Sequence, residues 1–191
     1  MQFRLFDQVA DAVATTAWRP ELSVEDIPAP RKMAPYALAI QADVTAAGAD
    51  AGSGRLVLLH DPDGNATWDG DFRCVVYVRA DIERDLAEDP LLADVGWSWL
   101  TDALDRNDAC YRAASGTVTV VSNKSFGTIA TDPSSCDVEL RASWTPDIDE
   151  PADVAGHLAA WSDLLCEAAG LELLPAGVVR LAERRAGSWE R

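Results

Sequence analysis

Apolar side chains recur at every second residue in several segments of this chain, most clearly over residues 72–80 and 138–144. In the first of these, the even-numbered positions are Phe72, Cys74, Val76 and Val78. The odd-numbered positions are Arg73, Val75, Tyr77 and Arg79. Successive side chains of a β-strand point to opposite faces of its sheet, so this period indicates strands with one apolar and one more polar face. The pattern predicts an antiparallel sheet that is covered on one face.

Five segments are expected to form strands: 36–44, 55–60, 72–80, 117–122 and 138–144. The tetrapeptide Asp61–Gly64 has the proline and glycine positions of a tight turn, and Asp69-Gly70 is a second turn signal. The small residues of 46–54 suggest a loop. The first three strands are therefore predicted to form a meander.

Three segments show the three- and four-residue spacing of amphipathic helices. These are residues 3–17, 92–106 and 153–169, and the last is followed by Gly170 at the position of a C-terminal cap. Trp99, Trp144 and Trp161 fall on faces that are expected to be buried. Four prolines lie within residues 19–35, which predicts an extended connection there and no helix.

These elements follow one another in the order α-β-β-β-α-β-β-α. Sequential strands with short turns predict an α+β fold, with an antiparallel five-stranded sheet and helices packed on one face. The order resembles the topology of type III secretion chaperones, an analogy that carries no function. A chain of 191 residues suits one domain, predicted over 1–179 and followed by a loosely ordered basic tail over 180–191.

The formal net charge of −16 restricts the partners of this chain. Nucleic acids and anionic lipids are bound mainly through lysine and arginine, so binding to either is not expected. No apolar run approaches the roughly 18 residues of a membrane span. The four cysteines are widely spaced, without a CxxC pair, and the N-terminus has no apolar signal region. A cytoplasmic protein is expected.

The segment 61–72 contains Asp61, Asp63, Asn65, Asp69 and Asp71, which are spaced like calcium ligands. An EF-hand loop that starts at Asp61 needs glycine at its sixth position and glutamate at its twelfth. Those positions hold Ala66 and Phe72. Because the bend and the bidentate carboxylate are missing, no metal site is expected.

Catalytic residues are not predicted either. The chain has two histidines, His60 and His157, which are too few for a metal site of their own. Ser115 lacks the flanking glycines of a nucleophile elbow. There is no GxGxxG or Walker loop, so neither a catalytic site nor a cofactor is expected, although an enzyme is not ruled out.

Arginines gather on one predicted strand face. Arg73, Tyr77 and Arg79 share a face of the strand 72–80, and Arg141 lies outward on 138–144. Two explanations remain open. The arginines could pair with carboxylates on neighbouring strands, or they could form a surface for an anionic ligand or an acidic partner.

Trp97 is the second candidate for a contact surface. Residues two apart on a helix point about 200° away from each other, so Trp97 and Trp99 are not expected to face the sheet together. Trp97 is then either covered by another segment, such as the proline-rich connection or the C-terminal segment, or exposed to a partner. As an exposed aromatic it would suit a protein–protein contact, including a homodimer.

Several stretches resemble a family from actinobacteria that is named only as domain of unknown function 3000. They are IPAP (27–30), HDPDGNATWDGDFR (60–73), DPLLADVGWSWLTDAL (89–104), ASGTVT (114–119), RASWTP (141–146) and HLAAWSDLLCEAAGL (157–171). The resemblance implies no activity, cofactor or catalytic residue.

The acidic composition and the missing catalytic signatures favour a non-enzymatic protein-binding or adaptor module. The alternative is a small-ligand-binding protein or an enzyme that uses a pocket between sheet and helices, near Arg73, Tyr77 and Arg79. The candidate partner or ligand surface is Trp97, Arg73, Tyr77, Arg79 and Arg141.

Overall fold

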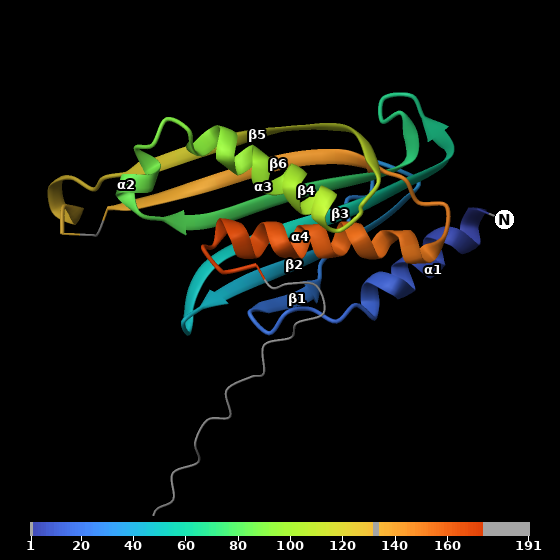
Figure 1. Cartoon of the computed structure of the whole chain (residues 1–191), viewed down its shortest axis with the longest axis horizontal. Helices are drawn as coiled ribbons and strands as arrows, with labels where there is room; N and C mark the ends of the chain where they lie inside the picture. Colours follow the sequence, from blue (N-terminus) through green and yellow to red (C-terminus); the bar gives the residue numbers. More distant parts are fainter. Residues whose placement is uncertain (1, 132–133, 174–191) are drawn as a thin grey trace, which may run out of the picture.

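A computed structural model describes residues 2–131 and 134–173 of the chain (Figure 1). The predicted basic tail, 180–191, lies outside the described residues. The elements in chain order are α1 (Gln2–Ala14), β1 (Leu22–Asp26), β2 (Tyr36–Ala46), β3 (Ala49–Asn65), β4 (Gly70–Ile82), α2 (Arg84–Ala87), α3 (Leu92–Arg106), β5 (Tyr111–Asn123), β6 (Ser135–Pro146) and α4 (Val154–Ala168).

The strands form one antiparallel sheet in the order β1-β2-β3-β4-β6-β5. The α+β class and the antiparallel sheet are confirmed. The predicted five strands and the element order α-β-β-β-α-β-β-α are wrong, because the sheet has six strands. The extra strand stands between α1 and β2, so the likeness to type III secretion chaperones, which rested on the predicted element order, no longer has that support.

The extra strand is β1, and it lies inside the segment predicted as an extended connection. Its five residues pair with β2 from Leu22 opposite Val44 to Asp26 opposite Ile40. Pro20 and Pro28 bracket it, and a strand at the edge of a sheet tolerates proline nearby because one of its sides needs no ladder. Five residues are too few to show a clear alternation, so tertiary pairing with β2 defines this strand.

One predicted loop and one predicted turn also change. The residues 46–54 form most of a hairpin, with a turn at Ala47 and Gly48, whose φ angles are 51° and 82°, as a two-residue hairpin turn requires. Asp61–Gly64 is not a turn. His60 pairs with Phe72 and Asn65 with Gly70, so these four residues bulge opposite the single residue Asp71. The chain reverses later, at 66–69.

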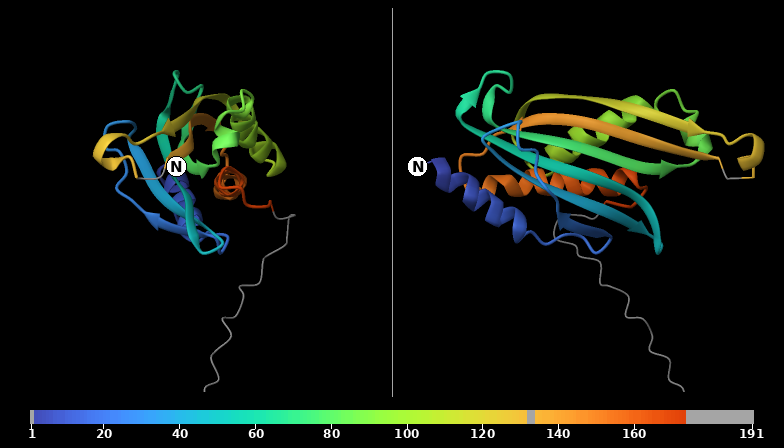
Figure 2. Two further views of the ribbon diagram at one scale, coloured as in Figure 1. Left: turned by 90° about the vertical axis from the view of Figure 1, so that its left-hand side faces the viewer. Right: turned by 180° about the vertical axis from the view of Figure 1, so that it is seen from behind.

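The helices α1, α3 and α4 lie on one side of the sheet, as two opposite views show (Figures 1 and 2). The side chains on that side of β4 are Phe72, Cys74, Val76 and Val78, and each is at most 2% exposed. The alternation in 72–80 therefore predicted the buried face correctly. We call the opposite side of the sheet the open face.

The helix α4 contacts β3, β4 and β6 and also packs against α3 and α1. Its Leu165 approaches the sheet at Gly54, where a Cβ atom would lie 2.5 Å from the Leu165 Cδ2 atom. Trp161, one turn earlier, is fully buried and meets Trp18 edge-on with ring centroids 5.6 Å apart. This helix fills the centre of the core.

The helix predictions are confirmed with small shifts at the ends. The segment 92–106 is α3, and α4 falls within 153–169, with Gly170 at φ 71° as the expected cap. The helix α1 ends at Ala14, three residues before the predicted end. Within the described ranges no helix is both long and apolar enough to span a membrane.

A buried hydrogen bond joins β6 to α4. The indole N–H of Trp144 donates to Nδ1 of His157 over 3.1 Å, and both side chains are almost completely buried. Only a neutral imidazole has a free lone pair on Nδ1. Burial accordingly lowers the pKa of His157 to about 4, although nearby Asp153 acts in the opposite direction.

We predict that Trp161→Ala lowers the free energy of unfolding by about 3–5 kcal/mol, because it removes a fully buried indole and leaves a cavity. Urea denaturation measures this loss. Phe126→Ala is the control: Phe126 is 71% exposed, so its removal should change stability by less than about 0.5 kcal/mol. A loss at Trp161 as small as the control's would show that α4 does not depend on this side chain.

We further predict a pH dependence from His157. Its pKa is about 4 in the folded protein and about 6.5 when unfolded, so the unfolded chain binds more protons between these values. The neutral imidazole therefore makes its full contribution to the free energy of unfolding above pH 6.5. This contribution falls as the pH falls, by about 2 kcal/mol at pH 5. Urea denaturation at pH 7.5 and pH 5 measures the loss in the protein and in His157→Gln.

The variant should lose about 2 kcal/mol less than the wild type between the two pH values, because its residue 157 does not titrate. Burial also lowers the pKa of His60, but His60 is present in both proteins and its effect cancels. An identical pH dependence of the two proteins would contradict the assignment.

Candidate functional site

The four polar residues predicted to share a surface are all on the open face, but only Tyr77 and Arg141 line its hollow, and Arg73 and Arg79 lie outside that lining. Arg73, Tyr77 and Arg79 come from β4, and Arg141 lies directly opposite Tyr77 on β6. On the other side of β4, Arg55 of β3 is also opposite Tyr77. The three strands thus place Arg55, Tyr77 and Arg141 in one row across the sheet.

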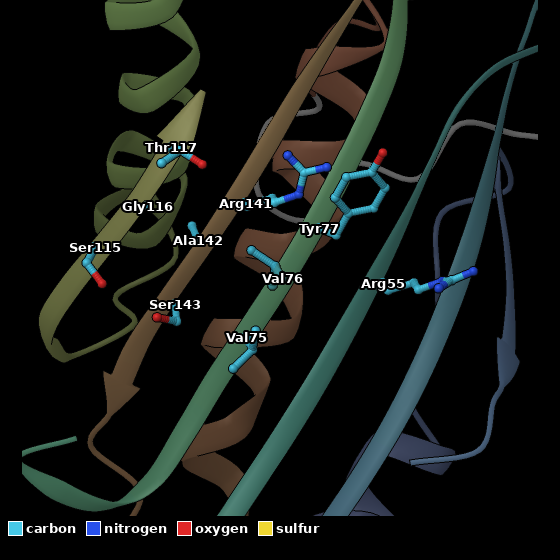
Figure 3. A pocket seen from close by; sticks show the side chains of 10 residues that line it. All are labelled: Arg55, Val75, Val76, Tyr77, Ser115, Gly116, Thr117, Arg141, Ala142 and Ser143. Atoms are coloured by element: carbon cyan, nitrogen blue, oxygen red, sulfur yellow. The ribbon is translucent and has the colours of Figure 1, made fainter. Parts of the chain in front are cut away.

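A shallow hollow of about 720 Å³ lies along this row and opens to solvent. Figure 3 shows the side chains that line it, which come from β3, β4, β6 and β5. They include Arg55, Val75, Tyr77, Ser115, Thr117, Arg141 and Ser143. The predicted alternative of a pocket between sheet and helices near Arg73, Tyr77 and Arg79 is wrong in its placement, because these side chains point away from the helices.

Tyr77 and Arg141 are fixed by Glu139. The Tyr77 hydroxyl donates to Oε1 of Glu139 over 3.0 Å, and Nη2 of Arg141 lies 2.6 Å from Oε2 of the same carboxylate. The Arg141 guanidinium also lies over the Tyr77 ring, 5.2 Å from its centroid. Partial burial, together with the bond to Glu139, raises the pKa of Tyr77. The phenol therefore remains protonated and donates.

Arg79 pairs with a buried carboxylate. Its Nη2 atom lies 3.0 Å from Oδ1 of Asp137, whose side chain is 4% exposed. This hydrogen bond raises the pKa of Arg79, and the guanidinium in turn compensates a charge that would be costly to bury alone. Pairing with carboxylates thus accounts for Arg79 and for Arg141.

Arg73 differs from the other arginines of the open face. It is 9% exposed, and the four oxygens that accept its hydrogen bonds are all neutral. They are the Ala113 carbonyl and Thr145 Oγ1, both at 2.9 Å, Ser143 Oγ at 2.7 Å and Ser115 Oγ at 3.4 Å. No carboxylate of the described residues forms an ion pair with it. Burial lowers the pKa of Arg73, the direction expected of a cation that lacks a countercharge.

Arg55 also has no ion-pair partner within residues 2–131 and 134–173. Its Nε atom donates to the side-chain oxygen of Gln41 over 3.1 Å, and its side chain is exposed at the edge of the hollow. Of these four arginines, Arg79 and Arg141 have carboxylate partners, whereas Arg55 and Arg73 have none in the described part of the chain.

Sequence analysis missed Arg55, Ser115, Ser143 and Thr145 as members of this site. Ser143 lies on the same strand parity as Arg141, which placed it on the outward face. Its proximity to Arg73 depends on the pairing of β4 with β6, and that of Ser115 on the pairing of β6 with β5. Both pairings join residues far apart in the sequence, and no local pattern gives their register.

Trp97 does not lie with the arginines. It belongs to α3, on the helix side of the sheet, and its ring approaches Gly116 of β5, where a Cβ atom would lie 2.8 Å from Trp97 Cζ3. Trp97 and Trp99 are both half-buried and both pack against the core. This is possible because α3 lies between β5 on one side and α4 on the other.

The residues considered for catalysis or metal binding are dispersed. Over the described ranges, no group of three or more histidine, cysteine, aspartate or glutamate side chains comes together in a way that could hold a metal ion. His60 is buried and stacks on Phe72 with ring centroids 4.1 Å apart. The cysteines are free thiols. Cys74, Cys136 and Cys166 are buried and Cys110 is exposed.

We predict that Trp97→Ala lowers the free energy of unfolding by about 1–2 kcal/mol, less than the cost of removing a fully buried indole, because Trp97 is only partly buried. Thermal and urea unfolding measure this effect, and analytical ultracentrifugation measures self-association in parallel. Unchanged stability with weakened association would instead place Trp97 in a contact between molecules.

A family model described as "Protein of unknown function (DUF3000)" matches residues 3–179. No curated protein and no solved structure matches. The matched segment contains every strand of the sheet and every residue of the open-face hollow. Because the match covers most of the chain, the chain belongs to this family of proteins of unknown function, as its sequence motifs indicated.

Proposed function

We propose that this protein is a non-enzymatic protein-binding module whose open face receives an extended acidic segment of a partner protein. One observation carries the proposal. In a chain with a net charge of −16, one face of the sheet holds two arginines, Arg55 and Arg73, without carboxylate partners among the described residues. The charged side chains that line the hollow, Arg55 and Arg141, are both positive, opposite in sign to the net charge of the chain.

Charge complementarity selects an acidic partner. Most of the surface of so acidic a chain repels other anions, so an acidic segment gains attraction only where cations gather. The hollow has Arg55 at its β3 side and Arg141 on β6, and Arg73 is hydrogen-bonded to its lining residues Ser115 and Ser143. A segment that reaches this hollow would also contact Val75 and the Tyr77 ring.

The shape of the hollow supports a protein segment over a small molecule. Small-molecule sites are clefts that bury most of their ligand, whereas this hollow is shallow and open. Neighbouring strands are about 4.8 Å apart, so the row from Arg55 on β3 to Arg141 on β6 spans roughly 10 Å of backbone. An extended chain can place acidic side chains along such a row.

A selection experiment tests this proposal without a known partner. A library of random decapeptides displayed on yeast is sorted against the folded, full-length protein at low ionic strength, and the affinities of the selected peptides are measured by fluorescence anisotropy. We predict that the selected peptides are acidic, and that Arg55→Glu/Arg141→Glu weakens their binding at least tenfold. Reversing these charges turns attraction into repulsion.

The matched control is Arg84→Glu, the same reversal at an exposed arginine on α2, which should leave the affinities unchanged. Failure to enrich acidic peptides, or equal binding to the wild type and the Arg55/Arg141 variant, would refute the proposal. Sedimentation of the protein alone tests a second copy as the occupant. If the protein self-associates and the same two substitutions abolish this association, the occupant of the hollow is a second copy of the chain and not an acidic segment of another protein.

A further inference from the structure

The hydroxyl groups that accept hydrogen bonds from Arg73 differ in whether they also donate one to another group of the protein. Thr145 Oγ1 accepts from Nη1 of Arg73 over 2.9 Å, and the same hydroxyl donates to the backbone carbonyl of Trp68. The hydrogen bonds from Arg73 to Thr145 and from Thr145 to Trp68 thus form a continuous series. Each of its donors has an acceptor within the protein.

Ser115 and Ser143 form only the first bond of such a series. Both hydroxyl oxygens accept from the same nitrogen, Nη2 of Arg73. A hydroxyl oxygen that accepts from a cation directs its own proton elsewhere, yet no acceptor for either proton is found within the part of the chain that the structure describes. The two serines are directly opposite each other on β5 and β6, line the hollow, and turn their hydroxyl groups toward one another (Figure 3).

We propose that Ser115, Ser143 and Arg73 form a carboxylate-binding subsite at the edge of the open-face hollow. The two serine hydroxyls donate to the carboxylate oxygens, and the guanidinium behind them supplies the countercharge. This inference rests on the proposed function, because the carboxylate would belong to an aspartate or glutamate of the acidic segment.

The charge of Arg73 selects the ligand class. One buried guanidinium is neutralised by one carboxylate, and a phosphate dianion would leave an excess negative charge in a chain that already carries −16. Hydrogen bonds from hydroxyls that are polarised by a cation are stronger than neutral ones. Two such donors side by side match the two oxygens of a single carboxylate.

A purely structural role for Arg73 is the alternative. Its bonds join β4, β5 and β6, since Ser115 and Ala113 lie on β5 and Ser143 and Thr145 lie on β6. These bonds stabilise the sheet whether or not an anion binds. A test must therefore follow anion binding itself, separately from stability.

The test is an NMR titration of the isotope-labelled, full-length protein with sodium acetate at pH 7 and constant ionic strength. We expect saturable shifts at the amides of residues 115 and 143 and at the Arg73 Nε–H group. Ser115→Ala/Ser143→Ala should weaken acetate binding at least about tenfold, because both donors are lost. Ser115→Thr/Ser143→Thr retains both hydroxyls and should preserve binding.

Ser53→Ala is the matched control, since Ser53 lies on β3 opposite Arg79, away from Arg73. Thermal unfolding of each variant shows whether it is folded. The subsite is refuted if the wild type shows no saturable shift, or if the alanine double variant binds acetate as the wild type does. Tighter binding of inorganic phosphate than of acetate would refute the assignment to a carboxylate.

Failure of this subsite and failure of the proposed function give different results. If the selected acidic peptides bind the wild type and the Ser115→Ala/Ser143→Ala variant equally, the subsite is refuted. The proposed role of Arg55 and Arg141 in binding the acidic segment would then still stand. Acetate binding at the serines without any selected acidic peptide would keep the subsite and refute the partner segment.

Discussion

The close contact between α4 and the sheet is the interaction on which the other elements depend. Leu165 reaches the backbone of β3 because Gly54 has no side chain there, and Trp161 of the same helix face is fully buried. With α4 at this depth, α1 and α3 pack beside it and cover the rest of the same face. All three helices therefore lie on one side, and the arginines of β3, β4 and β6 lie on the other side of the sheet.

In a sheet with one uncovered face, the charged side chains of that face need partners. Two arginines of this face have such partners within the protein, Arg79 in Asp137 and Arg141 in Glu139. Arg73 is the exception, because it is buried and bonded only to neutral oxygens. Burying a cation without a countercharge is costly, and four hydrogen bonds offset only part of that cost. The carboxylate that we propose as the ligand would supply the countercharge that Arg73 lacks.

The same network holds the site rigid. Arg73 is bonded to residues of β5 and β6 at once, and Thr145 extends the network to Trp68 in the turn between β3 and β4. Side chains held in this way lose little freedom when a ligand arrives, so less of the binding energy is spent on ordering them. The side chains around Arg73 are thus preorganised, as the proposed binding of a single carboxylate on a longer segment would require.

Local periodicity alone determined the helices α3 and α4, the buried parity of β4 and the outward position of Arg73, Tyr77, Arg79 and Arg141. These follow from the 3.6- and 2-residue repeats, which act over a few neighbouring residues. Only the tertiary structure decided the strand β1, the bulge at Asp61–Gly64, and which arginines have carboxylate partners. Those depend on strand pairing, and pairing brings together residues such as Arg73, Ser115 and Ser143 that are distant in the sequence. Register is fixed by the packing of the whole sheet, so no single segment of the sequence contains it.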